Sequence, residues 1–444
     1  MTMTSQVSFS GNAEIDGILY GTKWSDSSLT FSFAPAQTVT ATLLNSVQQD
    51  AVRKVLGSVA AVTNLSFSQV IETPLTEGTL RFGESEREAT AAAYMPSERS
   101  VGGDAWFNTS NYNSPKQGTY AFATFLHETG HALGLDHGQD GAYALPANHD
   151  SLEYSVMTYR SYPGASLNGY TAPEGSYPRS YMLADLAALQ YLYGANYATN
   201  AGNTTYRWSP SSGELLVDGV RSAKSTTNTI FETIWDGGGN DTYDFSAYAT
   251  ALRVDINPGG WTTTSSAQLA QLGDNHVARG NIASAYLYAG NLASLIENVK
   301  GGSGSDRITG NLIGNRLDGG GGNDKLLGGL GNDTLKGGSG SDRFVFNTAL
   351  SADNIDRLKD FRHDADRILL ENKIFAGIGS SLSSREFYAA AGITDAHDRS
   401  DRIVYDTASG NLYCDVDGRG GQAAVHFATL TTRPTLDHGD FAIV

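Results

Sequence analysis

Three histidines and a glutamate in one short run are the strongest chemical signal in the sequence: His127-Glu128-Thr-Gly-His131-Ala-Leu-Gly134-Leu-Asp-His137. On a helix, His127 and His131 share a face because they are four residues apart, so both imidazoles can reach one ion at about 2.0 to 2.1 Å. Gly134 allows a sharp turn that brings His137 back as the third nitrogen ligand. Three neutral imidazoles leave a position open for a water, whose pKa zinc lowers to about 7, and Glu128 is placed to take its proton. The pattern predicts one zinc ion and a hydrolytic reaction.

The elements that must position these residues belong to a mixed α and β region in about the first 200 residues. A helix is expected from about Thr119 to Leu133, with Phe122 and Leu126 facing inward and Gly134 as its stop. Apolar residues at three- and four-residue steps predict a second helix over 43–60, and a third is expected at Tyr181–Tyr193. The expected strands are Leu29–Phe33, Leu65–Val70, Leu80–Phe82 and Asp104–Asn108.

Glycine repeats dominate the chain beyond residue 200, where helical periodicity fades. Of the 51 glycines, 15 lie between residues 301 and 342. They form five nonapeptides, of which four fit G-G-x-G-x-D-x-U-x, the calcium nonapeptide of parallel β-rolls. The repeat that begins at Gly310 departs, with Ile313 and Asn315 where glycine and aspartate are expected. The other repeats begin at Gly301, Gly319, Gly328 and Gly337.

Each nonapeptide is expected to make a turn and then a short strand, and two turns close one coil, so that sides recur every 18 residues. Asp306, Asp324 and Asp342 should then stack, and Asn315 should lie over Asp333. Stacked carboxylates repel one another, but with glycine carbonyls they supply the six to eight hard oxygens that calcium prefers, so the roll should need calcium to fold. The inward apolar residues are Ile308, Leu317, Leu326, Leu335 and Phe344. The predicted calcium ligands are Gly302, Gly304, Asp306, Gly319, Gly320, Gly321, Gly322, Asp324, Gly329, Gly331, Asp333, Gly337, Ser339 and Asp342.

The histidine run resembles the long signature of the metzincin peptidases, which also carry a methionine turn. Ser155-Val-Met157-Thr-Tyr159 supplies that turn here. Together with the nonapeptides, it resembles the serralysin family of secreted bacterial zinc proteases over nearly the whole chain. The resemblance implies that Met157 forms the apolar floor under the zinc. It also implies that Tyr159 is a further, displaceable zinc ligand that swings away to stabilise the oxyanion.

The resemblance extends to three other segments. Gly103, Ala105, Trp106 and Asn108 resemble the edge strand on which the family lays its substrate. The C-terminal Asp440–Val444 resembles the acidic and then apolar terminus of proteins exported by type I secretion. Family calcium ligands are matched by Asp236, Gly238, Gly239 and Asp241, completed by backbone oxygens of Asn200, Gly202 and Thr204.

Composition bounds the class and the compartment. With 30 Lys and Arg against 47 Asp and Glu, the net charge of −17 argues against nucleic-acid or anionic-membrane surfaces. No run of about 18 apolar residues predicts a membrane span. Met1–Gly17 lacks the features of a Sec-type signal peptide, and the single Cys414 cannot form an internal disulfide, so we assign it no role. We expect a secreted, extracellular monomer.

The predicted fold is an α+β metzincin catalytic domain over residues 1–200, followed by an all-β calcium-binding parallel β-roll over 201–345 and a C-terminal β domain with the export signal over 346–444. We expect a calcium-dependent zinc endopeptidase that hydrolyses proteins through a water activated by Glu128. Its expected partners are protein or peptide substrates, the type I secretion apparatus and a small proteinaceous inhibitor. A propeptide of the family type is not evident, so lack of calcium is the expected means of latency.

Two other readings stay open at the level of sequence. One is a calcium-stabilised surface or adhesion protein whose metal domain has no turnover, against which Glu128 and Tyr159 argue. The other is a zinc hydrolase acting on non-peptide bonds, and an open edge strand beside the zinc would favour peptides over that reading.

Overall fold

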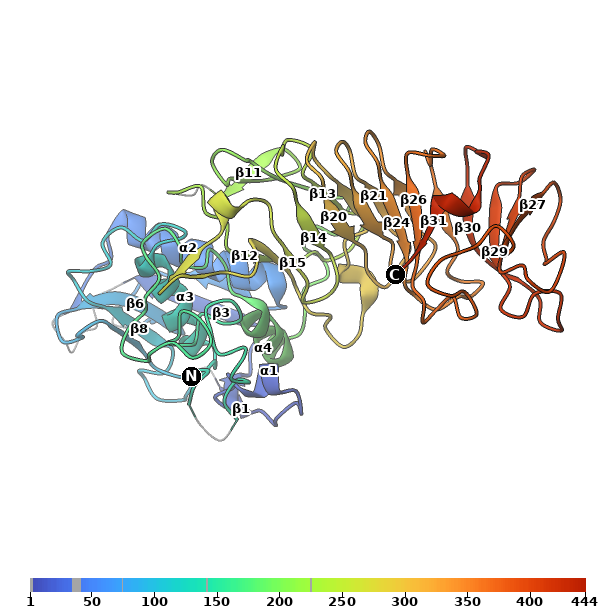
Figure 1. The fold of residues 1–444 in the computed structure, drawn as a ribbon. Coiled ribbons are helices and arrows are strands. Elements are labelled where there is room, and N and C mark those ends of the chain that lie inside the picture. The colour runs from blue at the N-terminus through green and yellow to red at the C-terminus, as the bar shows by residue number, and fades with distance from the viewer. Residues whose placement is uncertain (1–2, 34–40, 74, 141–142, 224–225) are drawn as a thin grey trace.

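The chain forms an elongated molecule in which helices gather at the N-terminal end and strands stack toward the C-terminal end (Figure 1). The computed structural model describes residues 3–33, 41–73, 75–140, 143–223 and 226–444. No helix among these residues is long and apolar enough to cross a bilayer. The N-terminal part holds the histidine run, and the stacked part holds the glycine repeats.

A mixed sheet forms the base of the N-terminal part, with strand order β5-β3-β6-β8-β7 and β4 paired to β6. β3, β5, β6 and β8 run parallel, and β7 runs antiparallel to β8 at the edge. The four strands expected from sequence all form, as β3, β5, β6 and β8. A separate hairpin joins β1 and β2. The bounds are β1 Thr4–Gln6, β2 Thr22–Trp24, β3 Ser28–Phe33, β4 Ala41–Thr42, β5 Ser66–Gln69, β6 Leu80–Ser85, β7 Ala91–Ala93 and β8 Asp104–Phe107.

Three main helices pack against this sheet and one another. The helix expected over 43–60 begins later, because Asn45 is its N-cap: the Asn45 side chain accepts from the amide of Gln48, whose side chain reaches back. The helix expected from Tyr181 begins at Leu183 because Met182 is extended, with its amide donated to Asp185. The bounds are α1 Ala13–Asp16, α2 Ser46–Val62, α3 Tyr120–Ala132 and α4 Leu183–Tyr193.

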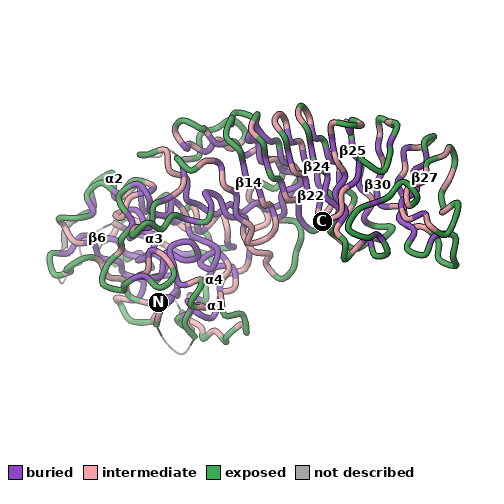
Figure 2. Tube along the Cα trace, viewed as in Figure 1, coloured by how far each residue is buried: buried purple, intermediate pink, exposed green. Residues whose placement is uncertain are grey.

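The repeats form a parallel β-roll of two strand stacks, and the expected period of 18 residues is confirmed. Arg307 pairs with Lys325 and Lys325 with Arg343 in one stack, while Arg316 pairs with Thr334 in the other. The five apolar residues expected to face inward are fully buried. The roll therefore has a dry interior and exposed turns (Figure 2). The repeat strands are β20 Arg307–Thr309, β21 Arg316–Asp318, β22 Lys325–Leu327, β23 Thr334–Lys336 and β24 Arg343–Phe346.

Further strands extend both stacks beyond the repeats. One sheet has twelve strands in the order β11-β10-β9-β13-β19-β21-β23-β25-β30-β29-β28-β27, and the opposite sheet has six in the order β14-β20-β22-β24-β26-β31. Their bounds are β9 Thr205–Trp208, β10 Leu215–Val217, β11 Val220–Ala223, β13 Thr242–Asp244, β14 Arg253–Asp255, β19 Asn298–Lys300, β25 Asp356–Leu358, β26 Arg367–Leu370, β27 Phe387–Ala390, β28 Ile403–Asp406, β29 Asn411–Cys414, β30 Val425–Leu430 and β31 Phe441–Ile443.

A small sheet of order β12-β18-β15 joins the two parts of the molecule. Phe231, Trp235 and Trp261 from this region belong to the same apolar core as α3 and α4, although they follow residue 200 in sequence. The strand-rich part is thus packed onto the helical part through a shared core. The bounds are β12 Glu232–Ile234, β15 Trp261–Thr262 and β18 Ile282–Ser284, with a nearby hairpin of β16 Gln271–Gly273 and β17 His276–Val277.

Candidate active site and metal centres

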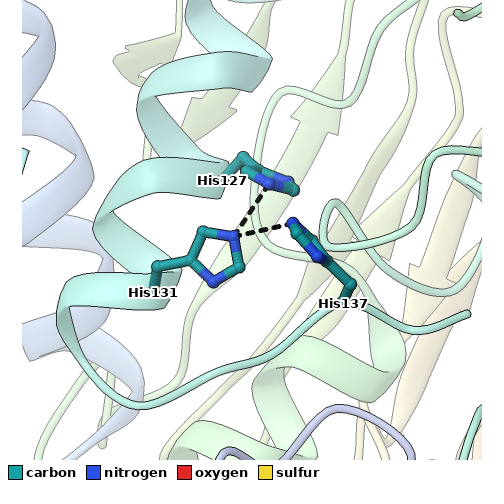
Figure 3. Close-up of side chains that lie close together, drawn as sticks. All are labelled: His127, His131 and His137. Carbon is teal, nitrogen blue, oxygen red and sulfur yellow. Dashed lines mark hydrogen bonds between the residues drawn. The ribbon is translucent and has the colours of Figure 1, made fainter. Parts of the chain in front are cut away.

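The three histidines of the run converge on one point. His127 and His131 project from α3, and the chain after the helix returns His137 toward them (Figure 3). The Nε2 atom of His131 lies 3.0 Å from the Nε2 atoms of both His127 and His137. Ligand nitrogens about 2.0 to 2.1 Å from a tetrahedral zinc lie roughly 3.3 Å from one another. The spacing therefore fits one zinc ion between the three rings.

The other ring nitrogen of each histidine faces an acceptor that fixes the tautomer. Nδ1 of His127 lies 2.8 Å from the carbonyl oxygen of Val156, and Nδ1 of His131 lies 2.8 Å from that of Leu135. Nδ1 of His137 lies 3.0 Å from a carboxylate oxygen of Asp140. Because a proton on each Nδ1 satisfies these acceptors, three Nε2 lone pairs point at one another, and a cation is what such a centre binds.

Burial keeps the two helical ligands in the neutral form that binds metal. It lowers the pKa of His127 to about 4 and that of His131 well below its usual value. Burial, followed by the charge of Glu88, raises the pKa of Glu128 to about 8. Glu128 adjoins His127 on α3 and lines the cleft beside the histidines. The centre thus pairs neutral ligands with a carboxyl group whose proton affinity suits acid and base chemistry near neutral pH.

The methionine turn lies directly under the helix that carries the ligands. Met157 is fully buried, and a Cβ atom at Gly130 would lie only 2.6 Å from its sulfur, so glycine is what allows the turn to approach α3. Asp185 holds the turn: its carboxylate accepts from the Ser155 hydroxyl at 2.5 Å and from the Val156 amide at 2.9 Å. Val156 in turn orients His127. Sequence reasoning missed Asp185, although an acidic residue in the first turn of a helix was the available signal.

Gly134 and Tyr159 both lie close to the histidine centre. Gly134 has φ +99°, and a Cβ atom there would lie 2.4 Å from the backbone oxygen of Thr22, so the sharp exit from α3 requires glycine. The Tyr159 hydroxyl lies 3.0 Å from Nε2 of His137. Burial, followed by Glu128, raises the pKa of Tyr159, which stays a proton donor at neutral pH.

A cleft of about 490 Å³ opens beside the centre and is lined by Glu128, His127 and Tyr159. Part of its wall is aromatic. The tyrosines that line it are Tyr112, Tyr120, Tyr170 and Tyr177.

The edge strand expected at Gly103–Asn108 is wrong, because β8 lies inside the sheet with β6 on one side and β7 on the other. Ala105 and Trp106 are buried, and the Asn108 amide donates to the carbonyl of Thr90. Gly103, at φ +82°, lies in the turn before β8. The edge is β7, whose three alanines carry no strand signal in a sequence, because alternation cannot be seen in a run of identical small residues.

The candidate calcium ligands that flank the start of the strand stacks come together. The carboxylate of Asp241 accepts from the Thr204 amide at 2.7 Å, and its Oδ2 atom is buried without a partner. The carboxylate of Asp236 accepts from the amide of Gly238 and lies against that of Asp241. A Cβ atom at Gly239 would lie 2.2 Å from the carbonyl oxygen of Gly202. The Asn200 side chain donates to the Tyr206 hydroxyl, and the backbone oxygen of Asn200 accepts from the Thr204 hydroxyl at 3.1 Å.

Buried carboxylate oxygens without partners mark the turns of the roll. Oδ1 of Asp324 accepts from the Asp306 amide at 2.7 Å, and Oδ1 of Asp342 accepts from the Asp324 amide at 2.9 Å, which confirms the expected stack. The Oδ2 atoms of Asp324, Asp333 and Asp342 are buried and have no hydrogen-bond donor, and among the described residues only that of Asp342 has a cationic side chain nearby, Arg362 at 3.7 Å. An orphaned carboxylate oxygen in a dry site is strongly destabilising unless a cation meets it, so these turns fit calcium.

Glycines make room for these oxygens in the turns. Cβ atoms at Gly319, Gly328 and Gly337 would lie 2.3, 2.0 and 2.3 Å from the Oδ2 atoms of Asp324, Asp333 and Asp342. Several glycines in these turns have positive φ angles, which residues with a side chain rarely adopt. Such angles occur at Gly320, Gly322, Gly329 and Gly331, whereas Gly302 and Gly304 have ordinary φ angles, and Gly321 bridges Ser339 in the next coil.

The divergent repeat is closed by amides rather than left open. The Asn315 side chain donates to Oδ1 of Asn311 at 3.2 Å and to the backbone oxygens of Ile296 and Glu297 at 3.4 and 3.3 Å. Donors of this chain thus occupy the place that a cation would take in the other turns. Sequence reasoning also missed Asp356 and Asp366, which continue the two ladders by accepting from the amides of Asp333 and Asp342. They lie 23 and 24 residues on, outside the nonapeptide period.

Comparisons with known proteins agree with this geometry. Residues 23–151 match the Matrixin family of peptidases, and residues 195–383 match the family described as Peptidase M10 serralysin C terminal. The chain is 37% identical over 314 residues to a metalloprotease AprA of Pseudomonas entomophila, covering 66% of this chain and 60% of that protein. It is 36% identical over 348 residues to serralysin G of Dickeya chrysanthemi, covering 73% and 66%.

A third relative spans more of both chains. The metallopeptidase AprA of Pseudomonas marginalis is 35% identical over 399 residues, which covers 82% of this chain and 78% of that protein. Too few residues of this chain lie outside the matched length for the match to leave out either the histidine centre or the repeats. The chain therefore belongs to the serralysin family of zinc metallopeptidases.

Proposed function

We propose that the chain is a calcium-dependent zinc endopeptidase that hydrolyses proteins. A zinc ion held by His127, His131 and His137 would lower the pKa of a bound water and polarise the peptide carbonyl. Glu128 takes the proton of the attacking water and passes it to the leaving amine. The Tyr159 hydroxyl, which lies 3.0 Å from Nε2 of His137, would donate a hydrogen bond to the developing oxyanion.

The position of β7 is the observation that favours peptides over other substrates. Ala91 belongs to β7 and also lines the cleft that Glu128 lines. Among the described residues, β7 has no partner on its outer side, so an extended peptide can add to this edge as a further strand. Such a peptide would pass beside the histidine centre. Neither a small-molecule hydrolase nor an adhesion module without turnover needs that arrangement.

The aromatic cleft supports a preference next to the scissile bond. Tyr120, Tyr170 and Tyr177 line it with apolar ring faces, and no lysine or arginine is among its lining residues. We infer that the cleft takes a large apolar or aromatic substrate side chain and disfavours an acidic or basic one.

The orphaned aspartate oxygens support calcium binding in the roll and at the cluster of Asp236 and Asp241. Extracellular calcium modules have Kd values of about 10⁻⁴ to 10⁻³ M, so such sites fill outside a cell and stay empty in the cytosol. We propose that the protein acts as a secreted enzyme. Export by a type I apparatus would precede folding, because Phe441–Ile443 is paired with β26 in the folded chain.

Casein hydrolysis, measured together with zinc content, tests the proposal. Glu128→Ala should keep one zinc per chain and lose activity by several orders of magnitude, whereas His131→Ala should lose the zinc itself. Glu371→Ala, at the end of β26 and remote from the centre, is the matched control and should behave as the wild type. Full activity in Glu128→Ala would end the hydrolase proposal.

A further inference from the structure

The hairpin of β16 and β17 belongs to the strand-rich part of the chain, yet it packs against the segment that follows the methionine turn. Leu272 is 1% exposed and lies in the same apolar core as α3. The amide of Gln271 donates to the Ser176 hydroxyl at 3.1 Å. The amide of Arg279, just after β17, donates to a carboxylate oxygen of Glu153 at 2.6 Å. The hairpin is thus fixed to the catalytic part of the molecule.

Two points of that segment are held by the hairpin. The Tyr162 hydroxyl donates to Oδ2 of Asp274 at 2.9 Å. The ring of Tyr162 also stacks on that of His276, with centroids 3.6 Å apart and an interplanar angle of 6°. The Thr171 hydroxyl donates to the carbonyl oxygen of Leu272 at 2.6 Å. Both ends of one short segment are therefore tied to the same hairpin.

Close packing at the second of these anchors requires a glycine in the hairpin. Gly273 has φ +91°, and a Cβ atom there would lie 2.4 Å from the Cβ atom of Thr171 and 2.6 Å from its carbonyl oxygen. Residues with a side chain rarely adopt this φ angle, and the space for a side chain is absent. The hairpin therefore touches the chain at Thr171 directly, backbone against residue.

Residues 163–169, which we call the lip, run between the two anchors and form part of the wall of the cleft. Leu167 and Gly169 line the cleft, as does Tyr170 directly after the lip. Ala165 is the one buried residue of the lip, and the others are exposed. A Cβ atom at Gly169 would meet nothing within 4 Å. Because so little of the lip is packed, its position depends on how its two ends are held.

Tyr170 carries the effect of the second anchor into the cleft. Its hydroxyl donates to the carbonyl oxygen of Thr158 at 2.5 Å, and its ring centroid lies 6.0 Å from that of Tyr120 and 5.8 Å from that of Tyr177. The anchored Thr171 fixes the backbone next to this ring. A substrate side chain that is large enough to reach Tyr170 and the lip gains their contacts, whereas a small one does not.

We propose that Asp274, His276 and the carbonyl group of Leu272 position the lip, so that the cleft selects a large apolar side chain next to the scissile bond. These groups act through Tyr162 and Thr171 and do not touch the substrate, so they are positioning residues. The selection rests on the proposed endopeptidase function. It adds to that function a role for the strand-rich part of the chain in the choice of substrate.

Two peptides that differ only in the residue next to the scissile bond, phenylalanine or alanine, test this role in the full chain loaded with zinc and calcium. Tyr162→Phe combined with Thr171→Val removes both hydroxyl donors with little change of shape. KM for the phenylalanine peptide should rise roughly tenfold at unchanged kcat, and both constants for the alanine peptide should stay at the wild-type values. Amides of 164–170 should exchange faster, while zinc content and the exchange of 120–132 should match the wild type.

Tyr388→Phe is the matched control. Tyr388 also stacks on a histidine, His397, with centroids 4.6 Å apart, but it lies in β27 at the far end of the molecule (Figure 1). This variant should keep the wild-type constants for both peptides.

An unchanged KM for the phenylalanine peptide in the double variant would overturn the proposal. Equal losses on the two peptides would overturn it as well, because the hairpin would then support the fold without selecting a side chain. Failure of the endopeptidase function would be seen in the wild type instead, which would cleave neither peptide and leave the lip nothing to select.

Discussion

The catalytic centre and the β-roll differ in the charge and the hydrogen bonding of the side chains that would bind a cation. At the catalytic centre the ligands are neutral, and each ring is oriented by an acceptor such as the carbonyl of Val156 or Leu135. In the roll the ligands are buried like charges, and Asp324 and Asp333 each carry an oxygen without a donor. The first site is therefore built whether or not its metal is present, whereas the second is costly without one. Zinc should govern the chemistry, and calcium should govern the fold.

Calcium removal should have the largest effect and tests this contrast most directly. Dialysis into calcium-free buffer that contains zinc should abolish amide protection over 301–346, because the stacked carboxylates then repel without a counter-ion. The helix 120–132 should keep its protection longer, since its ligands carry no charge. Hydrogen exchange read by mass spectrometry separates the two regions. Equal protection of the roll with and without calcium would break the comparison.

The sequence predicted the roll almost to the residue because nine-residue periodicity is a strong signal that tertiary packing only reinforces. The same holds for the histidine run, whose spacing on a helix allows little else. The strand at the substrate edge could not be predicted, because Ala91–Ala93 has no alternation and its role depends on pairing with β8. Asp185 and Asp140 were missed for a related reason. Asp185 accepts from the amide of Val156, which lies 29 residues away in the sequence. Asp140 contacts His137 from a loop whose composition is ordinary.

Tyr159→Phe should be the next largest effect and should leave the roll untouched. Loss of one oxyanion donor typically costs about 2.7 to 4 kcal/mol, so kcat should fall roughly 10² to 10³-fold while KM changes little. Zinc content and calcium-dependent protection should match the wild type, which separates chemistry from folding. Tyr143→Phe, at an exposed ring that packs at a tilt against Phe9, is the control. An unchanged kcat in Tyr159→Phe would remove this residue from the mechanism.

The pH dependence of stability should differ in sign with and without calcium. Burial raises the pKa of Asp306 to about 6 and that of Asp324 to about 7, from 3.8. A raised folded pKa means that the calcium-free roll is most stable below pH 3.8 and loses this stability as pH rises through 6 to 7. Calcium needs the ionised forms, so the loaded roll should gain stability over the same range. Amide protection factors over 301–346 at pH 5 and pH 8, in each calcium state, should show the inversion; parallel trends would contradict it.

The smallest expected difference lies between two positions of the roll itself. Asp324 stands between two carboxylates, because its amide donates to Asp342 and its Oδ1 accepts from the amide of Asp306. Asp333 accepts instead from the amide of Asn315, whose side chain closes its own turn without an ion. Asp324→Ala should therefore weaken two calcium sites and Asp333→Ala fewer.

The calcium midpoint of roll folding should consequently rise more in Asp324→Ala than in Asp333→Ala. Each calcium site that is filled at ten times its Kd contributes about 1.4 kcal/mol, so the calcium-dependent free energies of folding of the two variants should differ by about that amount. Circular dichroism of the full chain during a calcium titration measures both. Asn315→Asp sharpens the test, because it replaces the amide donor by a carboxylate and should make the roll bind more calcium. If the two alanine variants titrate alike, closure by the Asn315 amide does not exclude an ion, and the roll is less asymmetric than its hydrogen bonds indicate.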